Sequence, residues 1–171
     1  MKICILFFLG ASFGSFLGLV IDRFPEQSII RPSSHCSSCK KRLKVWDLIP
    51  ILSQLSTASK CRYCKVNIPY WYAGLEFLTG LTVLLCHFQL LSLTETILIL
   101  GGLVLTIYDI KHQEYPFAVW LVFTFVALLL SQLNWLFCCF LALAFLTEKW
   151  QLNIGSGDFL YLASLSLICG F

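Results

Sequence analysis

Two aspartates stand at the ends of apolar stretches, where charged residues are uncommon. Asp109 closes the run "TILILGGLVLTIYDI", and Asp158 opens the last apolar stretch directly after the glycine-rich turn "NIGSG". Two carboxylates held close together cannot both ionise cheaply, so such a pair shares one proton. The ionised member can activate a water molecule as a general base, while the protonated member polarises a scissile carbonyl. This is the chemistry of an aspartic protease, and it makes Asp109 and Asp158 candidate catalytic residues.

Each aspartate also has a purely structural explanation. Asp109 can mark the interfacial end of a helix, and Asp158 can be an N-cap beside a helix dipole. The neighbouring glycines, Gly155 and Gly157, let a backbone approach a substrate closely and permit φ > 0. A glycine-rich turn before a helix can instead bind phosphate. The adjacent acid and the absence of a nearby lysine argue against a phosphate site.

Four of the nine cysteines form two CxxC pairs separated by 21 residues. They are Cys36, Cys39, Cys61 and Cys64. Such pairs are typical of a structural zinc site with four thiolate ligands. Reduced thiols or disulfides are the alternatives, and a cytoplasmic location disfavours disulfides. The adjacent His35 is interpreted as a loop residue rather than a ligand, and the sequence shows no internal repeat.

The composition indicates an integral membrane protein. The 171 residues are 58% hydrophobic and only 12% charged, whereas a soluble domain carries about a quarter charged residues. We therefore predict an all-α polytopic membrane protein with a small cysteine-rich insert. Its six expected transmembrane helices are residues 3–21, 71–91, 96–110, 117–133, 135–147 and 158–171. A cleaved signal peptide is the alternative for the first helix, but the run is long and lacks a typical cleavage site.

Charge distribution predicts the orientation. The predicted domains are the first transmembrane helix at 1–21, the insert at 22–70 and a membrane domain at 71–171. Nine of the twelve Lys and Arg residues lie in the insert, so the positive-inside rule places it in the cytoplasm. Counting helices from there puts Asp109 and Asp158 at the same, cytoplasmic face. The Lys-Arg run at 40–44 is expected to face anionic lipid headgroups, and no nucleic-acid partner is expected.

Taken together and in order, these motifs resemble the prepilin peptidases, also called type IV leader peptidases, of the A24-type aspartic peptidase family. The resemblance is to the short kind found in Gram-positive competence systems. The matching stretches are "GASFGSFLGLVIDRFP", the CxxC insert, "IPYWYAGLEFLTG", "YDIKHQEYP" and "GSGD". By this resemblance Asp109 and Asp158 are the catalytic pair. It also places an acid at Glu76, which either supports the site or is a buried residue hydrogen-bonded to a neighbouring helix.

The resemblance further implies a function at the cytoplasmic membrane. The enzyme would be an intramembrane aspartic endopeptidase that removes the short basic leader of prepilin-like proteins. Its substrates would be prepilins or pseudopilins of a type IV pilus, competence or secretion system. Many members also N-methylate the new N-terminus, so S-adenosylmethionine would be a cofactor only where that activity is present. No methyl-donor motif is recognisable in the insert.

The chain departs from the family pattern in two places. Family members commonly carry a lysine shortly after the second aspartate, where this chain has Phe159 and Leu160. They usually also continue through further hydrophobic sequence beyond the equivalent of Phe171. We therefore expect a C-terminally shortened form that processes prepilin poorly. The alternatives are a truncated inactive homologue and a zinc-bearing membrane scaffold whose aspartates only cap helices.

Overall fold

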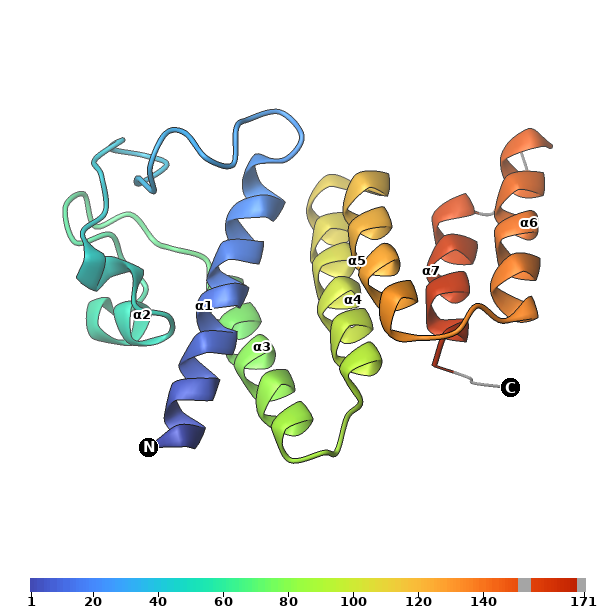
Figure 1. Cartoon of the computed structure of the whole chain (residues 1–171). Coiled ribbons are helices and arrows are strands. Elements are labelled where there is room, and N and C mark those ends of the chain that lie inside the picture. Colours follow the sequence, from blue (N-terminus) through green and yellow to red (C-terminus); the bar gives the residue numbers. More distant parts are fainter. Residues whose placement is uncertain (151–154, 169–171) are drawn as a thin grey trace. The chain divides into compact units, whose positions relative to one another are not determined.

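The computed structural model describes residues 1–150 and 155–168, which form helices, turns and loops without any β-strand in those ranges. The predicted all-helical fold class is confirmed for this part of the chain. The chain divides into two compact units, Met1–Phe88 and Gln89–Phe171. Figure 1 labels the α-helices of both units.

The first unit is a helical hairpin that carries the cysteine insert. Its helices are α1 (Lys2–Arg23), the short 3-10 helix η1 (Val45–Leu48), α2 (Leu52–Thr57) and α3 (Trp71–His87). The hairpin itself consists of α1 packed along α3. The insert connects the two helices, so both ends of the insert are fixed to the hairpin.

Glycine lets α1 and α3 approach each other closely. Gly10 and Gly14 on α1 are buried, and a Cβ added to Gly14 would lie 3.0 Å from the Cα of Glu76. Lipid tails are as apolar as leucine, so membrane helices associate through such small-residue contacts rather than through the hydrophobic effect. The small residues of α1 thus permit the close packing of α1 on α3.

The second unit consists of four helices. They are α4 (Leu93–His112), α5 (Phe117–Leu130), α6 (Trp135–Lys149) and α7 (Ser156–Ser166). Helix α4 packs on α5 and α6 packs on α7, while α7 also contacts α4 and α5. One apolar cluster joins all four helices through Leu98, Ala127, Phe137, Ala163 and the following Leu167.

Most helices differ by a few residues from the expected spans, and two of these differences bear on the site. Helix α4 begins three residues early because Ser92 and Glu95 form a capping box, in which each side chain accepts the other's backbone N–H at 3.2 and 2.7 Å. The pattern Ser-x-x-Glu is a known start signal, and the sequence analysis overlooked it. The last span was expected over 158–171, but α7 ends at Ser166, and residues 169–171 lie outside the described part.

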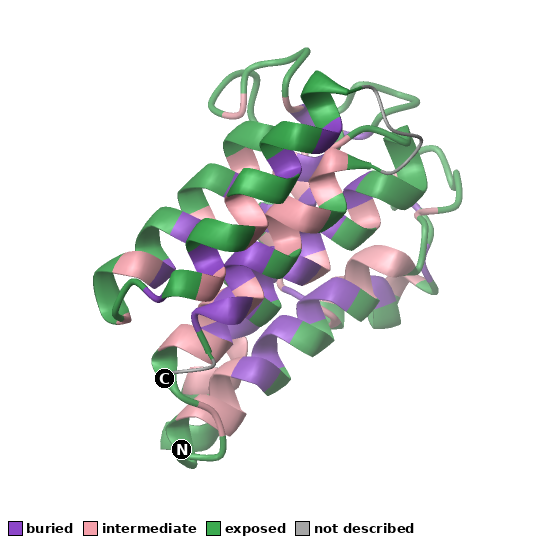
Figure 2. Cartoon of the chain, turned by 90° about the vertical axis from the view of Figure 1, so that its right-hand side faces the viewer, coloured by how far each residue is buried: buried purple, intermediate pink, exposed green. Residues whose placement is uncertain are grey.

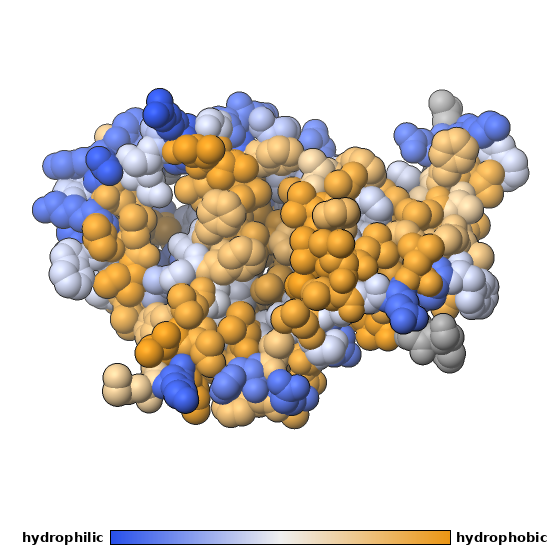
Figure 3. Space-filling model, viewed as in Figure 1, coloured by the Kyte–Doolittle hydropathy of each residue, from blue (hydrophilic) through white to orange (hydrophobic). Residues whose placement is uncertain are grey.

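The apolar surface of the helices suits a membrane. Within the described residues, α1 and α4 are long and apolar enough to cross one, and α5 is a shorter apolar helix. Buried positions follow one side of the helices and exposed positions the other (Figure 2). On the face shown in Figure 3, apolar residues cover the sides of the helices and hydrophilic residues gather toward their ends. The structure agrees with a multi-pass membrane protein, while six crossings remain a prediction.

Candidate active site and metal centre

Asp109 and Asp158 lie at the same end of the second unit. Helices α4 and α6 run in one direction and α5 and α7 in the other (Figure 1), so the last turn of α4 and the first turn of α7 share one end. Asp109 belongs to that last turn and Asp158 to that first turn. Both side chains are left exposed by the protein. Their common end agrees with the count of spans, and contact between the two carboxyls remains a prediction.

Helix stability explains the position of Asp158 but not that of Asp109. The N-cap of α7 is Gly155, so the interpretation of Asp158 as an N-cap is wrong. Asp158 is the third residue of α7, where the positive end of the helix dipole favours an acid. Asp109 lies in the last turn of α4, where the negative end of the dipole disfavours one. The location of Asp109 therefore calls for another explanation.

Tyr115 connects the turn after α4 to the start of α7. Its ring lies against Gly157, where an added Cβ would be 2.6 Å from a ring carbon. Burial raises the pKa of Tyr115, and Tyr161 and Asp158 nearby raise it further, so the phenol stays protonated at neutral pH. The Tyr115 hydroxyl is buried without a hydrogen-bond partner among the described residues. A buried polar atom without a partner needs a specific explanation, and sequence reasoning missed this residue.

The two glycines before Asp158 act differently from the expectation. Gly155 has φ −61° and ψ 121°, and Gly157 lies inside α7, so the positive φ values allowed for them are not adopted. Among the described residues, a Cβ at Gly155 would meet only the Asp158 carboxylate, at 3.5 Å. A Cβ at Gly157 would collide with the Tyr115 ring. Gly157 is therefore required by packing, and Gly155 is not.

A groove of about 350 Å³ lies beside the contact between Tyr115 and Gly157. Its wall is mostly apolar and comes from α5, α6 and α7, namely Phe117, Leu141, Ala144, Phe145 and Leu160, with the polar Glu148 and Ser156. A volume of this size is within the range of small-ligand and peptide side-chain sites. The groove can therefore hold an apolar segment next to the turn that carries Asp158.

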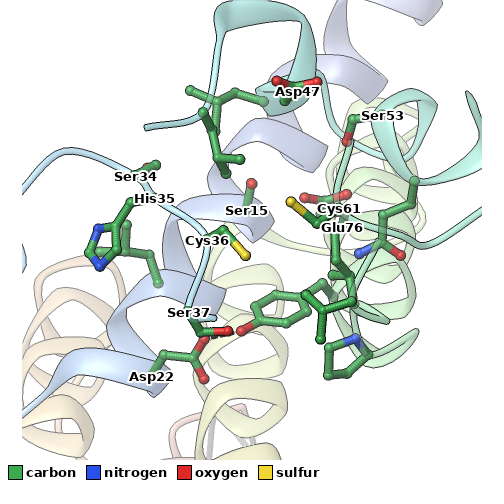
Figure 4. A pocket seen from close by; sticks show the side chains of 18 of the residues that line it. Ser15, Asp22, Ser34, His35, Cys36, Ser37, Asp47, Ser53, Cys61 and Glu76 are labelled. Atoms are coloured by element: carbon green, nitrogen blue, oxygen red, sulfur yellow. Dashed lines mark hydrogen bonds between the residues drawn. The ribbon is translucent and has the colours of Figure 1, made fainter. Parts of the chain in front are cut away.

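Glu76 lies in the first unit and fastens the insert to the hairpin. It is only 7% exposed, accepts the backbone N–H of Ile51 at 2.7 Å and is hydrogen-bonded by Ser15 of α1. It lines a cavity of about 270 Å³. In the same cavity Tyr72 donates its hydroxyl proton to Asp22 (Figure 4). Of the two interpretations of Glu76, the geometry matches the buried, hydrogen-bonded residue.

The four CxxC cysteines converge to one point. Their sulfur atoms all lie within 4.8 Å of one another, and the Sγ atoms of Cys36 and Cys64 are 3.7 Å apart. All four are free thiols. Backbone N–H groups of Cys64 and Tyr63 lower the pKa of Cys61, while burial and the neighbouring thiols raise the pKa of Cys64. Four converging thiols fit a single metal ion, and His35 instead contacts the carbonyl of Ser33 at 2.9 Å.

The two CxxC turns are copies of each other, offset by 25 residues. In the first, the N–H of Lys40 donates to the Cys36 carbonyl at 3.0 Å, and in the second the N–H of Lys65 donates to Cys61 at 3.0 Å. Both lysines have positive φ, 55° and 60°. The stretches 34–43 and 59–68 share the pattern Ser-x-Cys-x-x-Cys-Lys. The statement that the sequence has no internal repeat is therefore wrong.

Comparison with known proteins identifies relatives along the chain. The family model of the Bacterial Peptidase A24 N-terminal domain matches residues 8–90. The Prepilin leader peptidase/N-methyltransferase of Myxococcus xanthus is 46% identical over 82 residues, which are 47% of this chain and 24% of that protein. The Bacillus subtilis protein of the same name is 40% identical over 77 residues, covering 44% and 31%. The Neisseria gonorrhoeae one is 29% identical over 213 residues, covering 95% and 72%.

These matches differ in extent. The match covers only 24% of the Myxococcus xanthus protein, 48% of a leader peptide-processing enzyme of Escherichia coli and 52% of a prepilin leader peptidase/N-methyltransferase of Stutzerimonas stutzeri. The chain therefore spans about half of these relatives' length or less. No solved structure matches the chain.

We predict that Gly157→Ala is destabilising only because of Tyr115. The new Cβ forces the ring to move, and overpacking costs about 1–3 kcal/mol, against a gain in helix propensity of about 1 kcal/mol. In a Tyr115→Ala background only the gain remains, so Gly157→Ala should then stabilise the chain. The measurement is a double-mutant cycle of unfolding free energies in detergent.

Gly155→Ala serves as the matched control, because its Cβ would meet nothing closer than 3.5 Å. It should change the unfolding free energy by the same amount in both backgrounds, because alanine is a poorer N-cap than glycine whether or not the Tyr115 ring is present. Equal effects of Gly157→Ala with and without the Tyr115 ring would show that the ring does not constrain this position.

Proposed function

Because the chain resembles the Bacterial Peptidase A24 N-terminal domain over residues 8–90 and is similar to prepilin leader peptidases, we propose that it removes the leader of prepilin-like proteins as an aspartic endopeptidase in the membrane. The observation that carries the proposal is the contact of Tyr115 with Gly157. Tyr115 lies in the loop that follows the helix of Asp109, and Gly157 lies in the first turn of the helix of Asp158. The dipole of α4 disfavours an ionised acid at Asp109. A proton shared with Asp158 would explain why an acid is present there.

The proposed reaction is the hydrolysis of one peptide bond. The dipole of α7 favours the negative charge on Asp158, so Asp158 is the general base that takes a proton from water. The resulting hydroxide attacks the scissile carbonyl carbon while the protonated Asp109 donates a hydrogen bond to the carbonyl oxygen. When the C–N bond breaks, the proton on Asp158 passes to the leaving amine. Both carboxyl groups thereby return to their starting states.

Tyr115 and the groove beside it would position the substrate. The Tyr115 hydroxyl is a buried donor without a partner in the described residues, so a substrate carbonyl can supply its missing acceptor. The apolar wall formed by Phe117, Phe145 and Leu160 suits the hydrophobic part of a prepilin next to its leader. This arrangement would hold the scissile bond against the turn that carries Asp158, and alignment of this kind is a large part of catalysis.

We place six helices across the cytoplasmic membrane, with the insert 22–70 and both aspartates on the cytoplasmic side and 71–171 as the peptidase region. The concentration of nine of twelve Lys and Arg residues in the insert supports this orientation. The substrates would be prepilins or pseudopilins of a pilus, competence or secretion system. The relatives are also named N-methyltransferases, and we assign no residue of this chain to a reaction with S-adenosylmethionine.

We assign a structural zinc ion to the four converging thiols. Tetrahedral zinc at about 2.3 Å from each sulfur would hold the sulfurs about 3.8 Å apart. The 3.7 Å between Cys36 and Cys64 supports this, as does the 4.8 Å limit for all pairs. The metal would hold the two copied turns together, and its role would be to fold the insert rather than to act on the substrate.

A membrane scaffold without catalysis is the competing function, and the aspartates decide between the two. We predict that Asp109→Asn and Asp158→Asn each slow leader removal by about a hundredfold or more, because each removes one half of the proton exchange. The measurement is cleavage of a co-expressed prepilin, monitored as a mobility shift of the prepilin on a gel. The variants are compared at equal amounts of the chain in the membrane. Normal cleavage by either variant would favour the scaffold.

Glu114→Gln is the control for the loss of a negative charge in the same region. Glu114 is exposed and lies in the turn between α4 and α5, but it has no role in the proposed reaction. It should retain cleavage close to that of the unchanged chain.

We predict that Tyr115→Phe slows leader removal roughly tenfold without loss of stability. Removing a buried hydroxyl that has no partner normally leaves stability equal or higher. A loss of activity therefore isolates the role of the hydroxyl toward the substrate. Cleavage rates and unfolding midpoints are measured on the same preparations, and unchanged cleavage would remove Tyr115 from the mechanism.

We predict about one zinc ion per purified chain, measured by elemental analysis under reducing conditions. Cys61→Ala should lose the zinc because it removes one of four ligands from a buried position. Cys138→Ala is the matched control, since Cys138 is a free cysteine on α6 outside the cluster. Equal zinc content in both variants would contradict the assignment.

A further inference from the structure

The segment from η1 to α2 has an amphipathic pattern opposite to that of a soluble protein. Leu55 is 72% exposed while the neighbouring Gln54 is 8% exposed. Val45 and Trp46 of η1 are 77% and 72% exposed. Polar side chains normally face water and large apolar ones normally lie inside. The reversal indicates that the outer face of this segment meets an apolar medium.

The position of the segment along α1 also indicates that its outer face meets an apolar medium. Ile51 precedes α2 and donates its N–H to the Glu76 carboxylate, which is also bonded by Ser15 of α1. Ser15 lies eight residues before Arg23, the last residue of α1, which is about 12 Å along the helix axis. Figure 1 likewise shows α2 at the level of the middle of α1. The segment therefore lies alongside α1 and not beyond its end.

We propose that η1 and α2 form a re-entrant element in which the exposed Leu55 of α2 contacts the lipid acyl chains and the exposed apolar residues of η1 lie nearer the headgroups. The inference rests on the proposed function, because it takes α1 to cross the membrane with Arg23 at the surface. Headgroup layers are about 5–7 Å thick on each side of the hydrocarbon core, so a depth of about 12 Å passes beyond them. Lipid acyl chains are thus what the outer face meets.

Backbone at such a depth must have its polar groups satisfied by protein. The N–H of Ile51 is bound by Glu76 at 2.7 Å, and the carbonyl of Gln54 accepts the N–H of Ser59 at 2.8 Å. On the inner side, Ser53 and Gln54 line the same cavity as Glu76, and Figure 4 shows Ser53 beside this cavity. The polar side chains of the element thus face this cavity, while Leu55 points away from the protein.

Charge complementarity favours lipid over a protein partner as the occupant. The insert carries nine Lys and Arg residues but only three Asp and Glu residues, which suits anionic headgroups. Trp46 is a residue type enriched at membrane interfaces. Apolar side chains next to a basic surface are the pattern of interfacial membrane segments. The fixed attachment of the insert to α1 and α3 keeps these groups at the membrane.

The test is photo-crosslinking of the full chain in vesicles of phosphatidylcholine with phosphatidylglycerol. Benzoylphenylalanine replaces Leu55, and lipid adducts are measured by mass spectrometry. Phe16, 49% exposed on α1, is the lipid-facing reference, and Ile30, 86% exposed in the loop after α1, is the control outside the membrane. We expect adducts at Leu55 to match those at Phe16 and to exceed those at Ile30 roughly tenfold, because hydrocarbon surrounds only the first two.

Each other outcome has a distinct meaning. Adducts at Phe16 with only the Ile30 level at Leu55 would overturn the re-entrant element and leave the proposed function intact. Crosslinks from Leu55 to protein alone would replace lipid by a protein partner and would also overturn it. Absence of adducts at Phe16 would overturn the membrane placement of α1 itself.

A second measurement does not depend on the probe. Leu55→Asp should lower the membrane level of the chain several-fold, because a charge in an apolar medium is costly. Ile30→Asp should leave the level unchanged, although Ile30 is the more exposed of the two residues. Equal tolerance of both changes would show that Leu55 faces water.

Discussion

The structure depends on close backbone contact between helices that cannot gain stability by burying apolar surface. In lipid, association depends on packing and on interhelical hydrogen bonds. Gly14 supplies close packing between α1 and α3, and Gly157 supplies it between α7 and the turn after α4. Side-chain bonds complete the second unit: Trp120 donates to the carbonyl of Leu160 at 3.0 Å, and Asn134 donates to that of Ser166 at 2.5 Å. The same contacts that hold the helices also bring the acid-bearing turns together.

Elements that depend on local sequence were predictable. Long apolar runs predicted the helices, and paired CxxC motifs predicted the converging thiols, because both signals are carried by neighbouring residues. The role of Gly157 was not predictable, since it depends on a ring more than 40 residues away, that of Tyr115. The unpartnered hydroxyl of Tyr115 is likewise a property of the packed site. The motif containing Tyr115 was recognised, but only for its aspartate.

In α2 an apolar residue is exposed and a polar residue is buried. Such a segment can be interpreted from its sequence only if the medium around it, water or lipid, is known. The insert carries nine Lys and Arg residues, and six of these lie in the two copied cysteine turns. The six residues of α2 lie between these turns, yet Leu55 is exposed and Gln54 is buried. Average polarity over 22–70 hides this local reversal. A segment of one and a half turns is also too short for a reliable periodic signal.

The position of Asp109 connects the helix geometry to the proposed chemistry. An ionised acid in the last turn of α4 faces the partial negative charge of the helix C-terminus, whereas an ionised Asp158 faces the positive N-terminus of α7. If the two share one proton, its place on Asp109 removes the unfavourable charge and leaves the favourable one on Asp158. Under the proposed function, the helix dipoles would therefore favour the proton on Asp109. Lys111 and His112 belong to the same last turn of α4 as Asp109, so the dipoles are one contribution to the charge at this end of the helices and not its whole cause.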